Sequence, residues 1–360
     1  MALDHYVTLG RSGLRVSPMC LGTMTFGEVL GWGSSEADSK AIIDRYLERG
    51  GNFIDTANVY TLGHAEVIVG NHLAHTKKRD RVVVATKFYS NMFPGDPNGG
   101  GAGAKSLIAA CHESLRRLKT DYIDLYWMHA WDRHTPIEET LRALDDLVRA
   151  GKVRYIGFSD TPAWKLAQAQ TTTHFRGWAP LVALQIEYSL LERTVEDELV
   201  PAAHELGLGI TPWSPLKGGV LTGKYTRANA GTVKSDRGVT VNANLTDKAY
   251  NLIDALVAIG KELATTPASV ALAWLLGRPG VTSPIFGARS LEHLEANLSA
   301  LTVALTPSQR ARLDELSTPV LPFPAKFMSF AGTFMHGGMT VNGDSAPPWQ
   351  TGAAPDAKRY

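Results

Sequence analysis

The sequence predicts an α/β protein built as a (β/α)8 TIM barrel, with an N-terminal β-hairpin and a long C-terminal tail. Eight apolar runs of strand length recur along the chain, and helical segments separate them. The runs are apolar nearly throughout, which is typical of parallel strands covered by helices on both faces of a sheet. Eight such units in a chain of 360 residues fit a closed barrel.

The predicted strands follow a short hairpin, formed by Tyr6–Leu9 and Leu14–Ser17 around a glycine-containing turn. The eight expected strands are Met19–Met24, Asn52–Ala57, Val82–Lys87, Ile123–His129, Val153–Ser159, Val182–Tyr188, Leu208–Trp213 and Thr282–Phe286.

The predicted helices carry start and stop signals. Thr135-Pro136 opens one helix, with Glu138 in its first turn, and Gly151 closes it; Gly207 closes another. The expected helices are Asp38–Arg49, Ala65–Ala74, Lys105–Leu118, Ile137–Ala150, Ala163–Thr171, Val195–Leu206, Asp247–Ala264, Pro267–Leu276 and Leu291–Ala300.

A doubly wound open sheet is the alternative fold. It requires a glycine-rich turn directly after the first strand, and Gly22–Gly27 does not spell G-x-G-x-x-G. The barrel is therefore favoured, and it occupies residues 1–318. Residues 319–360 form a tail rich in Pro, Gly, Met and aromatic side chains, which we expect to pack near the barrel rim.

Charge and composition restrict the function classes. Lys and Arg total 36 and Asp and Glu total 35, so the chain lacks the basic excess that nucleic acids or anionic membranes attract. The two cysteines, Cys20 and Cys111, cannot build a disulfide framework or a cysteine metal site. With no signal peptide or long apolar stretch, we expect a soluble cytoplasmic protein; its oligomeric state cannot be read from the sequence.

Polar residues gather where the predicted strands end, which is the active-site end of a parallel barrel. Lys87 ends an apolar run, and Asp55 at the end of the neighbouring strand is its natural partner. The ammonium would lower the pKa of Tyr60 toward the working range, while a neutral His129 could hold a carbonyl oxygen. Such a site could protonate a carbonyl oxygen while another group delivers hydride.

Competing motifs are incomplete. The chain has no H-E-x-x-H, H-x-H or G-x-S-x-G sequence, which leaves zinc and serine hydrolases without support, and we expect no metal. Gly218–Tyr225 approaches a phosphate-binding loop, but Tyr225 replaces the required Ser or Thr. Its glycines and Lys224 could still hold a phosphate of another ligand.

Four segments together resemble the aldo-keto reductase superfamily, in its bacterial NADPH-dependent branch related to potassium-channel β subunits and aryl-alcohol dehydrogenases. The resemblance is carried by Asn52–Glu66, Ser114–His129, Gly151–Gly157 and Trp213–Tyr225, and it extends from about Leu9 to Leu316.

The resemblance implies a barrel that binds NADPH or NADP+ across its carboxyl end. It assigns Tyr60 as general acid, Lys87 and Asp55 as the pair that tunes it, and His129 as the group that orients the carbonyl. The implied cofactor contacts, besides Asp55, are Gly22, Thr23, Met24, Ser159, Asp160, Gln185, Trp213, Ser214, Leu216, Gly218, Lys224, Gly287, Arg289, His293 and Asn297.

Within those contacts, Ser159, Asp160 and Gln185 would hold the nicotinamide carboxamide, and Trp213 would stack on its ring. Arg289 falls where the family binds the 2′-phosphate.

Three positions depart from the family pattern. Asp160 stands where the family usually has Asn, and a carboxylate lacks the amide donor. His293 replaces a common Gln or Arg near the 2′-phosphate, and Ala296 replaces a Glu near the adenine.

The sequence thus favours an NADP(H)-dependent reductase of aldehydes or ketones, acting reversibly on a small-molecule carbonyl or alcohol. A redox-sensing or regulatory subunit that binds NADPH with little turnover is the alternative. The residues expected to line the substrate pocket are Trp32, Tyr89, Met92, Phe93 and Trp131.

Overall fold

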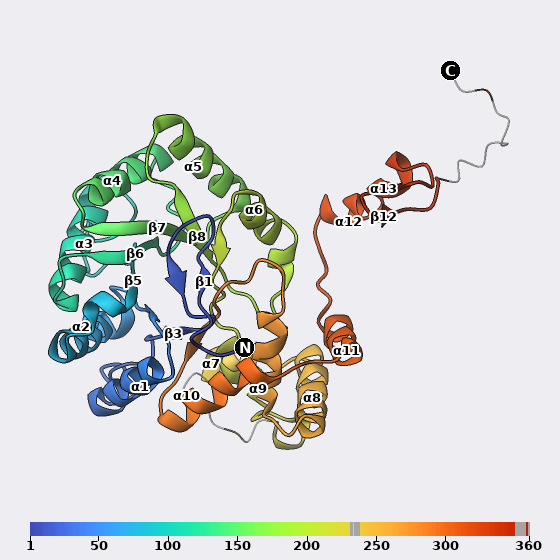
Figure 1. Cartoon of the computed structure of the whole chain (residues 1–360), viewed down its shortest axis with the longest axis horizontal. Coiled ribbons are helices and arrows are strands. Elements are labelled where there is room, and N and C mark those ends of the chain that lie inside the picture. The colour runs from blue at the N-terminus through green and yellow to red at the C-terminus, as the bar shows by residue number, and fades with distance from the viewer. Residues whose placement is uncertain (231–232, 234–237, 350–357, 359–360) are drawn as a thin grey trace. The chain divides into compact units, whose positions relative to one another are not determined.

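The computed structural model describes the whole chain except residues 231–232, 234–237, 350–357 and 359–360. The chain divides into two compact units, Met1–Thr318 and Pro319–Tyr360 (Figure 1).

The first unit is a (β/α)8 barrel, as the sequence predicts. Its eight parallel strands are β3 (Cys20–Gly22), β4 (Phe53–Asp55), β5 (Val83–Phe88), β6 (Ile123–Met128), β7 (Val153–Ser159), β8 (Leu181–Gln185), β9 (Gly209–Ile210) and β10 (Ile285–Gly287). From β3 to β9 each strand pairs with the next, and β10 pairs with β3. The amide of Ile285 donates to the carbonyl oxygen of Pro212 at 2.8 Å, which joins the last strand to the segment after β9.

The main helices surround the strands (Figure 1). They are α1 (Glu36–Glu48), α2 (His64–Thr76), α3 (Ala104–Leu118), α4 (Ile137–Arg149), α5 (Ala163–Arg176), α6 (Leu199–Glu205), α7 (Gly238–Ala243), α8 (Asp247–Glu262), α9 (Pro267–Leu276), α10 (Leu291–Leu298) and α11 (Pro307–Ser317). Hydroxyl caps begin several of them: the side chains of Ser35, Thr246, Thr266 and Ser290 accept hydrogen bonds from backbone amides in the first turns.

Apolar side chains form one core between strands and helices and another inside the barrel. Inside, Trp127 of β6 is fully buried against β7, where Gly157 leaves it room. A Cβ atom at Gly157 would lie 2.4 Å from the Trp127 ring, so this position requires glycine. The barrel interior is thus a packed core that holds the strand ends rigidly.

The N-terminal hairpin, β1 (Val7–Thr8) and β2 (Arg15–Val16), covers the amino end of the barrel. Its turn residue Gly10 has φ +59°, and a Cβ atom there would lie 2.2 Å from the carbonyl oxygen of Val182 at the start of β8. The candidate active site lies at the opposite, carboxyl end of the barrel.

The second unit contains α12 (Ala325–Met328), α13 (Ala331–Met335) and a hairpin of β11 (Thr340–Val341) and β12 (Asp344–Ser345). Phe334 packs on Trp349, with ring centroids 4.0 Å apart, and on Phe327. The sequence showed no period here because each element is only a few residues long.

Two helix predictions need correction. The helix expected at Val195–Leu206 is a short 3-10 turn followed by α6, because Pro201 lacks an amide hydrogen and fits only within the first helical turn. Helix α11 was not predicted from the sequence, although Thr306 and Gln309 form a capping box around its N-terminal proline.

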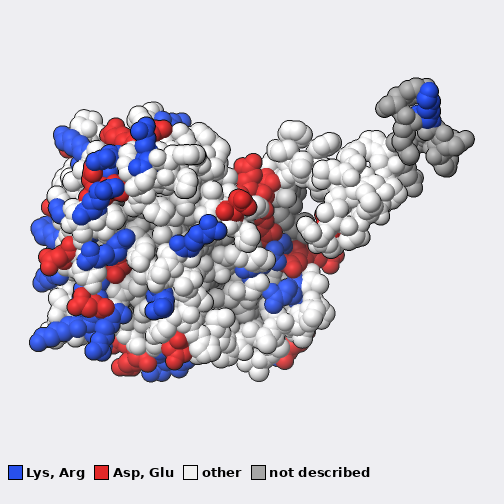
Figure 2. Space-filling model, turned by 45° about the horizontal axis from the view of Figure 1, so that its top comes forward, with Lys and Arg blue, Asp and Glu red and all other residues white. Residues whose placement is uncertain are grey.

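Lys, Arg, Asp and Glu are interspersed on the face of the barrel unit seen in Figure 2. Among the described residues, no single helix has the length and apolar composition to cross a bilayer; α8 and α9 meet those criteria only as a pair bent by 97°.

Candidate active site

The carboxyl ends of β4, β5 and β6 bring four predicted catalytic side chains together. Asp55 ends β4, Lys87 lies one residue before the end of β5, and His129 directly follows β6. Tyr60 reaches the same place from the loop after β4, at the start of a 3-10 turn that spans Tyr60–Gly63.

That turn is held in an unusual backbone conformation. Thr61 and Leu62 have φ values of 47° and 57°, which residues with side chains rarely adopt. The buried hydroxyl of Thr61 donates to the carbonyl oxygen of Phe26 at 2.9 Å and accepts from the amide of Ala65 at 3.0 Å. These bonds fix the loop, so the position of Tyr60 is set by structure outside the strand.

Lys87 is the centre of the cluster. Its side chain is fully buried, and its ammonium forms an ion pair with the Asp55 carboxylate. It also donates to the carbonyl oxygen of Thr56 at 2.9 Å and to the Tyr60 hydroxyl at 3.1 Å. Gln185, at the end of β8, donates to the other Asp55 oxygen at 3.1 Å. All three protons of the ammonium therefore have acceptors, which makes its burial tolerable.

The electrostatics keep protons on Lys87 and Tyr60. Desolvation by burial lowers the pKa of Lys87. The interactions of its ammonium with Asp55 and Tyr60 raise the pKa by more, so the net shift is upward. Desolvation raises the pKa of Tyr60 above its ordinary 10.0, although the Lys87 charge opposes the shift. The expectation that Lys87 brings this pKa down to the working range was therefore wrong in its net direction, because desolvation exceeds the pull of the ammonium. A protonated phenol is the form that a general acid requires.

His129 lies beside Tyr60, with ring centroids 5.9 Å apart in an edge-on arrangement. Desolvation, together with the charge of Lys87, lowers the pKa of His129 to about 3, so the imidazole is neutral at physiological pH. Its buried Nδ1 atom has no hydrogen-bond partner among the described residues.

A second set of side chains follows β7, β8 and β9. Ser159 ends β7, and its buried hydroxyl makes no hydrogen bond of standard geometry among the described residues, although it lies close enough to Asp160 to oppose the desolvation that raises the pKa of that carboxyl. The next residue, Asp160, accepts a hydrogen bond of 3.0 Å from the indole nitrogen of Trp213, in the segment after β9. Unpartnered buried polar atoms are rare, and here they occur where the sequence predicts ligand contacts.

The loop after Trp213 has an unusual backbone conformation. Ser214, Lys217, Gly218 and Gly219 all have positive φ, and the amide of Gly218 donates to the Ser214 hydroxyl at 3.1 Å. A Cβ atom at either glycine would meet nothing within 4 Å, so space is open above the loop. The amides of Lys217 and Gly219 also donate within the loop, so the loop offers open space rather than free amides.

The remaining predicted cofactor residues lie on or after β3, after β9, on or after β10, and on α10. Thr23 is buried and donates to the carbonyl oxygen of Asp55 at 3.1 Å, whereas Met24 is exposed. Asn297 is buried in α10, and its amide donates to the carbonyl oxygen of Gly287 at 3.1 Å. The other predicted residues here are the buried Gly22, the half-buried Leu216, and the exposed Lys224, Arg289 and His293.

The five residues expected to line the substrate pocket do not all contact one another in the structure. Met92 and Phe93 lie with Asn58 in a hollow of about 420 Å³ beside α3. Trp131 instead packs edge-on against Trp164 of α5, at 5.5 Å between centroids. Trp32 is half-buried, as is Tyr89, whose φ of 123° is strained.

The sequence analysis did not single out Trp164 or its neighbour Lys165. The Lys165 ammonium lies 4.7 Å from the Trp164 ring centroid and 5.8 Å from that of Trp131. The signal available was an aromatic residue at the start of a helix that follows a barrel strand.

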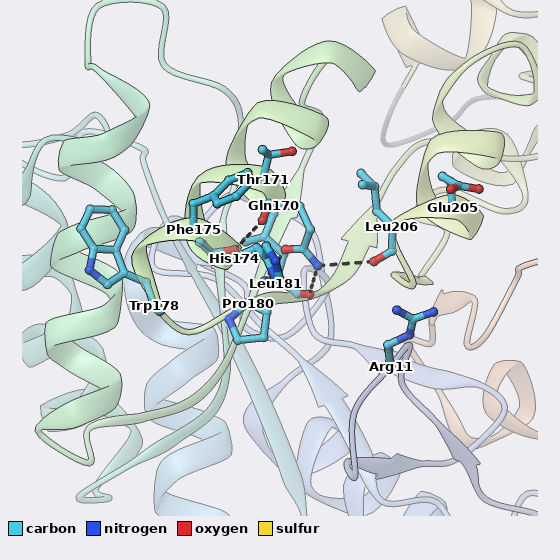
Figure 3. Close-up of a pocket in the computed structure, with 12 residues that line it drawn as sticks. Arg11, Gln170, Thr171, His174, Phe175, Trp178, Pro180, Leu181, Glu205 and Leu206 are labelled. Atoms are coloured by element: carbon cyan, nitrogen blue, oxygen red, sulfur yellow. Dashed lines mark hydrogen bonds between the residues drawn. The ribbon is translucent and has the colours of Figure 1, made fainter.

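A larger hollow, of about 600 Å³, lies at the opposite end of the barrel (Figure 3). Its wall includes Gln170, whose side-chain amide donates to the carbonyl oxygens of Leu181 and Leu206. Because Leu181 starts β8, this hollow is at the amino end, where barrels keep structural rather than catalytic residues.

Comparison with known proteins agrees with this geometry. The sequence profile of the Aldo/keto reductase family matches residues 18–318. The chain belongs to the aldo/keto reductase family. It is 42% identical over 311 residues to the oxidoreductase YrpG of Bacillus subtilis, covering 84% of this chain and 92% of that protein.

Two fungal relatives extend the comparison. An aryl-alcohol dehydrogenase of Pestalotiopsis microspora is 33% identical over 335 residues, which is 91% of this chain and 86% of the relative. A norsolorinic acid reductase of Aspergillus flavus is 33% identical over 334 residues, which is 90% of this chain and 84% of the relative. As a member of this family, the chain is an oxidoreductase that acts on carbonyl compounds.

Proposed function

We propose that the protein is an NADP(H)-dependent oxidoreductase that reduces an aldehyde or ketone to an alcohol, and that it also runs the reverse reaction. The observation that carries the proposal is the buried cluster of Asp55, Lys87, Tyr60 and His129, in which the phenol is protonated and hydrogen-bonded to an ammonium.

The residues at the barrel mouth fit a nicotinamide dinucleotide. The unpartnered Ser159 hydroxyl and the Asp160 side chain can hold the nicotinamide end, with Gln185 beside them and Trp213 against the ring. The open space above the glycine loop suits the pyrophosphate. Arg289 and His293 would select the 2′-phosphate, since a guanidinium pairs well with phosphate. When bound, the cofactor supplies hydride.

The protein's own groups supply the proton and the orientation. The substrate oxygen would accept hydrogen bonds from the Tyr60 hydroxyl and from the neutral His129. Tyr60 donates its proton as the carbonyl becomes an alcohol, and the adjacent Lys87 ammonium stabilises the phenolate that remains. Asp55 compensates the lysine charge and holds the ammonium in place.

We further propose that the substrates are aromatic carbonyls and alcohols. Trp131, two residues after His129 in the chain, packs edge-on against Trp164, and relatives are named aryl-alcohol dehydrogenase and norsolorinic acid reductase. Aromatic rings gain offset or edge-to-face contacts with tryptophan beyond their buried area.

Binding and turnover can be tested separately. NADPH affinity is measured by titration with NADH as the control, in the wild type and in Arg289→Ala; a loss confined to NADPH supports the 2′-phosphate role. The complex is then given benzaldehyde or cyclohexanecarbaldehyde, which share a six-membered ring but differ in aromaticity. Faster oxidation of NADPH with benzaldehyde supports the aromatic proposal. Tight NADPH binding without turnover across a panel of carbonyl compounds would instead support the regulatory-subunit alternative.

A further inference from the structure

Asp160 places a carboxylate beside the site of hydride transfer. It follows β7 directly and has φ +43°, a conformation that Asp and Asn tolerate better than most residues. Its Oδ1 atom accepts the Trp213 indole hydrogen at 3.0 Å, which fixes the carboxylate next to the ring expected to face the nicotinamide. This position therefore carries an ionisable carboxylate rather than a neutral side chain.

Charges from several elements act on this carboxylate. Tyr60 and Asp160 influence one another electrostatically, which puts Asp160 within range of the proton donor. Glu187, after β8, opposes its ionisation, and Lys87 on β5 favours it. Glu187 is itself paired with Lys217 at 2.8 Å. Among the described residues Asp160 forms no ion pair, so its charge remains available to a cation at the mouth.

The cofactor in the proposed function changes charge as it reacts. Its nicotinamide ring carries a positive charge in NADP+ and none in NADPH. A neighbouring carboxylate attracts the cation and has no such interaction with the neutral ring. A neutral asparagine at this position would interact about equally with the oxidised and the reduced nicotinamide.

We propose that the ionised Asp160 carboxylate makes this site prefer the oxidised nicotinamide over the reduced one. The inference rests on the proposed function, since it requires NADP(H) to bind at this mouth. Two consequences follow. The equilibrium between bound reactants is shifted toward NADP+ and the alcohol, the products of carbonyl reduction, and the NADP+ formed is retained and inhibits further turnover.

The preference depends on pH. Desolvation is the largest influence on Asp160 and raises its pKa to about 6, with the Trp213 hydrogen bond and Lys87 opposing the shift and Glu187 adding to it. Above this pKa the carboxylate is charged and the preference is present; below it the group is neutral and the preference disappears. Ionisation of the 2′-phosphate affects both nucleotides equally, so it cancels in their ratio.

The test is the ratio of dissociation constants, Kd for NADPH divided by Kd for NADP+. NADPH is titrated by its fluorescence, and NADP+ by displacement of bound NADPH. The proteins are the wild type, Asp160→Asn, which keeps the shape and the acceptor oxygen, and Asp121→Asn as a control. Asp121 is an exposed aspartate just before β6, at the opposite end of the barrel.

At about pH 8, well above the Asp160 pKa, we expect Asp160→Asn to lower this ratio about tenfold, whereas Asp121→Asn leaves it unchanged. At about pH 5 the wild-type ratio should fall to that of Asp160→Asn. Equal ratios in the wild type and Asp160→Asn at both pH values, with both nucleotides bound, would overturn the inference alone. Failure of the wild type to bind either nucleotide would overturn the proposed function itself.

Discussion

The two ends of the barrel satisfy their buried polar groups differently. At the amino end, Arg79 donates to the backbone carbonyls of Val82 and Tyr122 and pairs with Asp124 at 2.8 Å. The buried hydroxyl of Ser17 is likewise bonded to the Tyr46 hydroxyl at 2.6 Å. At the carboxyl end, buried atoms of Ser159 and His129 have no partner among the described residues.

Positive φ occurs at both ends: Lys77 and Lys119 adopt it where α2 and α3 end, at the amino end of the barrel. Thr61, Tyr89, Asp160 and Ser214 all have positive φ and all lie on loops at the carboxyl end. Such conformations and unpaired groups cost free energy and persist where the surrounding fold imposes them. Among the groups compared, Arg79 and Ser17 are bonded at the amino end, while Ser159 and His129 retain bonding capacity for a ligand at the carboxyl end.

The largest expected effect is loss of the proton donor. Tyr60→Phe should lower the reduction rate by about 10²–10⁴-fold while NADPH still binds, because general acid catalysis contributes on this scale. Tyr122→Phe removes a phenol that bonds Asp80 at the amino end and should leave the rate unchanged. Steady-state kinetics with an aromatic aldehyde checks both; a near-native rate in Tyr60→Phe would remove this residue from the mechanism.

One ion pair at each end of the barrel, Lys87–Asp55 and Arg79–Asp124, should separate stability from activity. Lys87→Met leaves the Asp55 carboxylate buried without its partner, so we expect about 3–5 kcal/mol lower unfolding free energy and no measurable turnover. Adding Asp55→Asn should restore much of the stability but not the activity. Arg79→Met should also destabilise the fold yet keep the turnover per folded molecule.

Denaturant unfolding and rates normalised to folded protein measure these effects. If the double variant at Asp55 and Lys87 regained activity along with stability, the pair would be only structural.

Two buried serines, one at each end of the barrel, allow the same comparison with smaller expected changes in stability and NADPH affinity. Ser159→Ala removes an unpartnered hydroxyl, so its unfolding free energy should stay the same or rise by up to about 1 kcal/mol while NADPH affinity falls several-fold. Ser17→Ala removes a bonded hydroxyl at the amino end and should cost about 1–2 kcal/mol with no change in NADPH affinity. Thermal or urea unfolding together with NADPH titration gives both values; reversed stability effects would break the comparison between the ends.

The smallest expected effect is that of His129 on the pH profile. Because the pKa of His129 is lowered to about 3, its titration should leave no inflection in the reduction rate near its ordinary 6.5. The raised pKa of Tyr60 should keep reduction steady through neutral pH, whereas alcohol oxidation, which needs the phenolate, rises with pH. A rate inflection near 6.5 that vanishes in His129→Asn would contradict the neutral imidazole.

The barrel could be predicted because its strands are buried on both faces and read as continuous apolar runs. Asp55, Lys87 and His129 could be found because each lies at or directly after the end of such a run. The partition of the chain near Thr318 and the packing of the tail on the rim were inferred from composition, and the latter stays a prediction.

Other features could not be read from the sequence because they depend on three-dimensional packing. The net pKa shift of Tyr60 depends on how desolvation balances the ammonium, and a sequence shows the ammonium but not the burial. The pairing of Trp131 with Trp164 joins the loop after β6 to the start of α5, and the bond from Trp213 to Asp160 joins two different strand ends. None of these contacts has a sequence spacing that reveals it.

One single-turnover experiment tests most directly the central claim that Tyr60 is the proton donor in an NADPH-dependent reduction. Enzyme with NADPH bound is mixed with excess benzaldehyde, and the loss of reduced-nicotinamide absorbance is followed for the wild type and Tyr60→Phe. The account predicts complete oxidation of the bound NADPH by the wild type and an almost flat trace for the variant. Identical absorbance traces for the two proteins, whether both show rapid NADPH oxidation or neither shows any, would contradict the account.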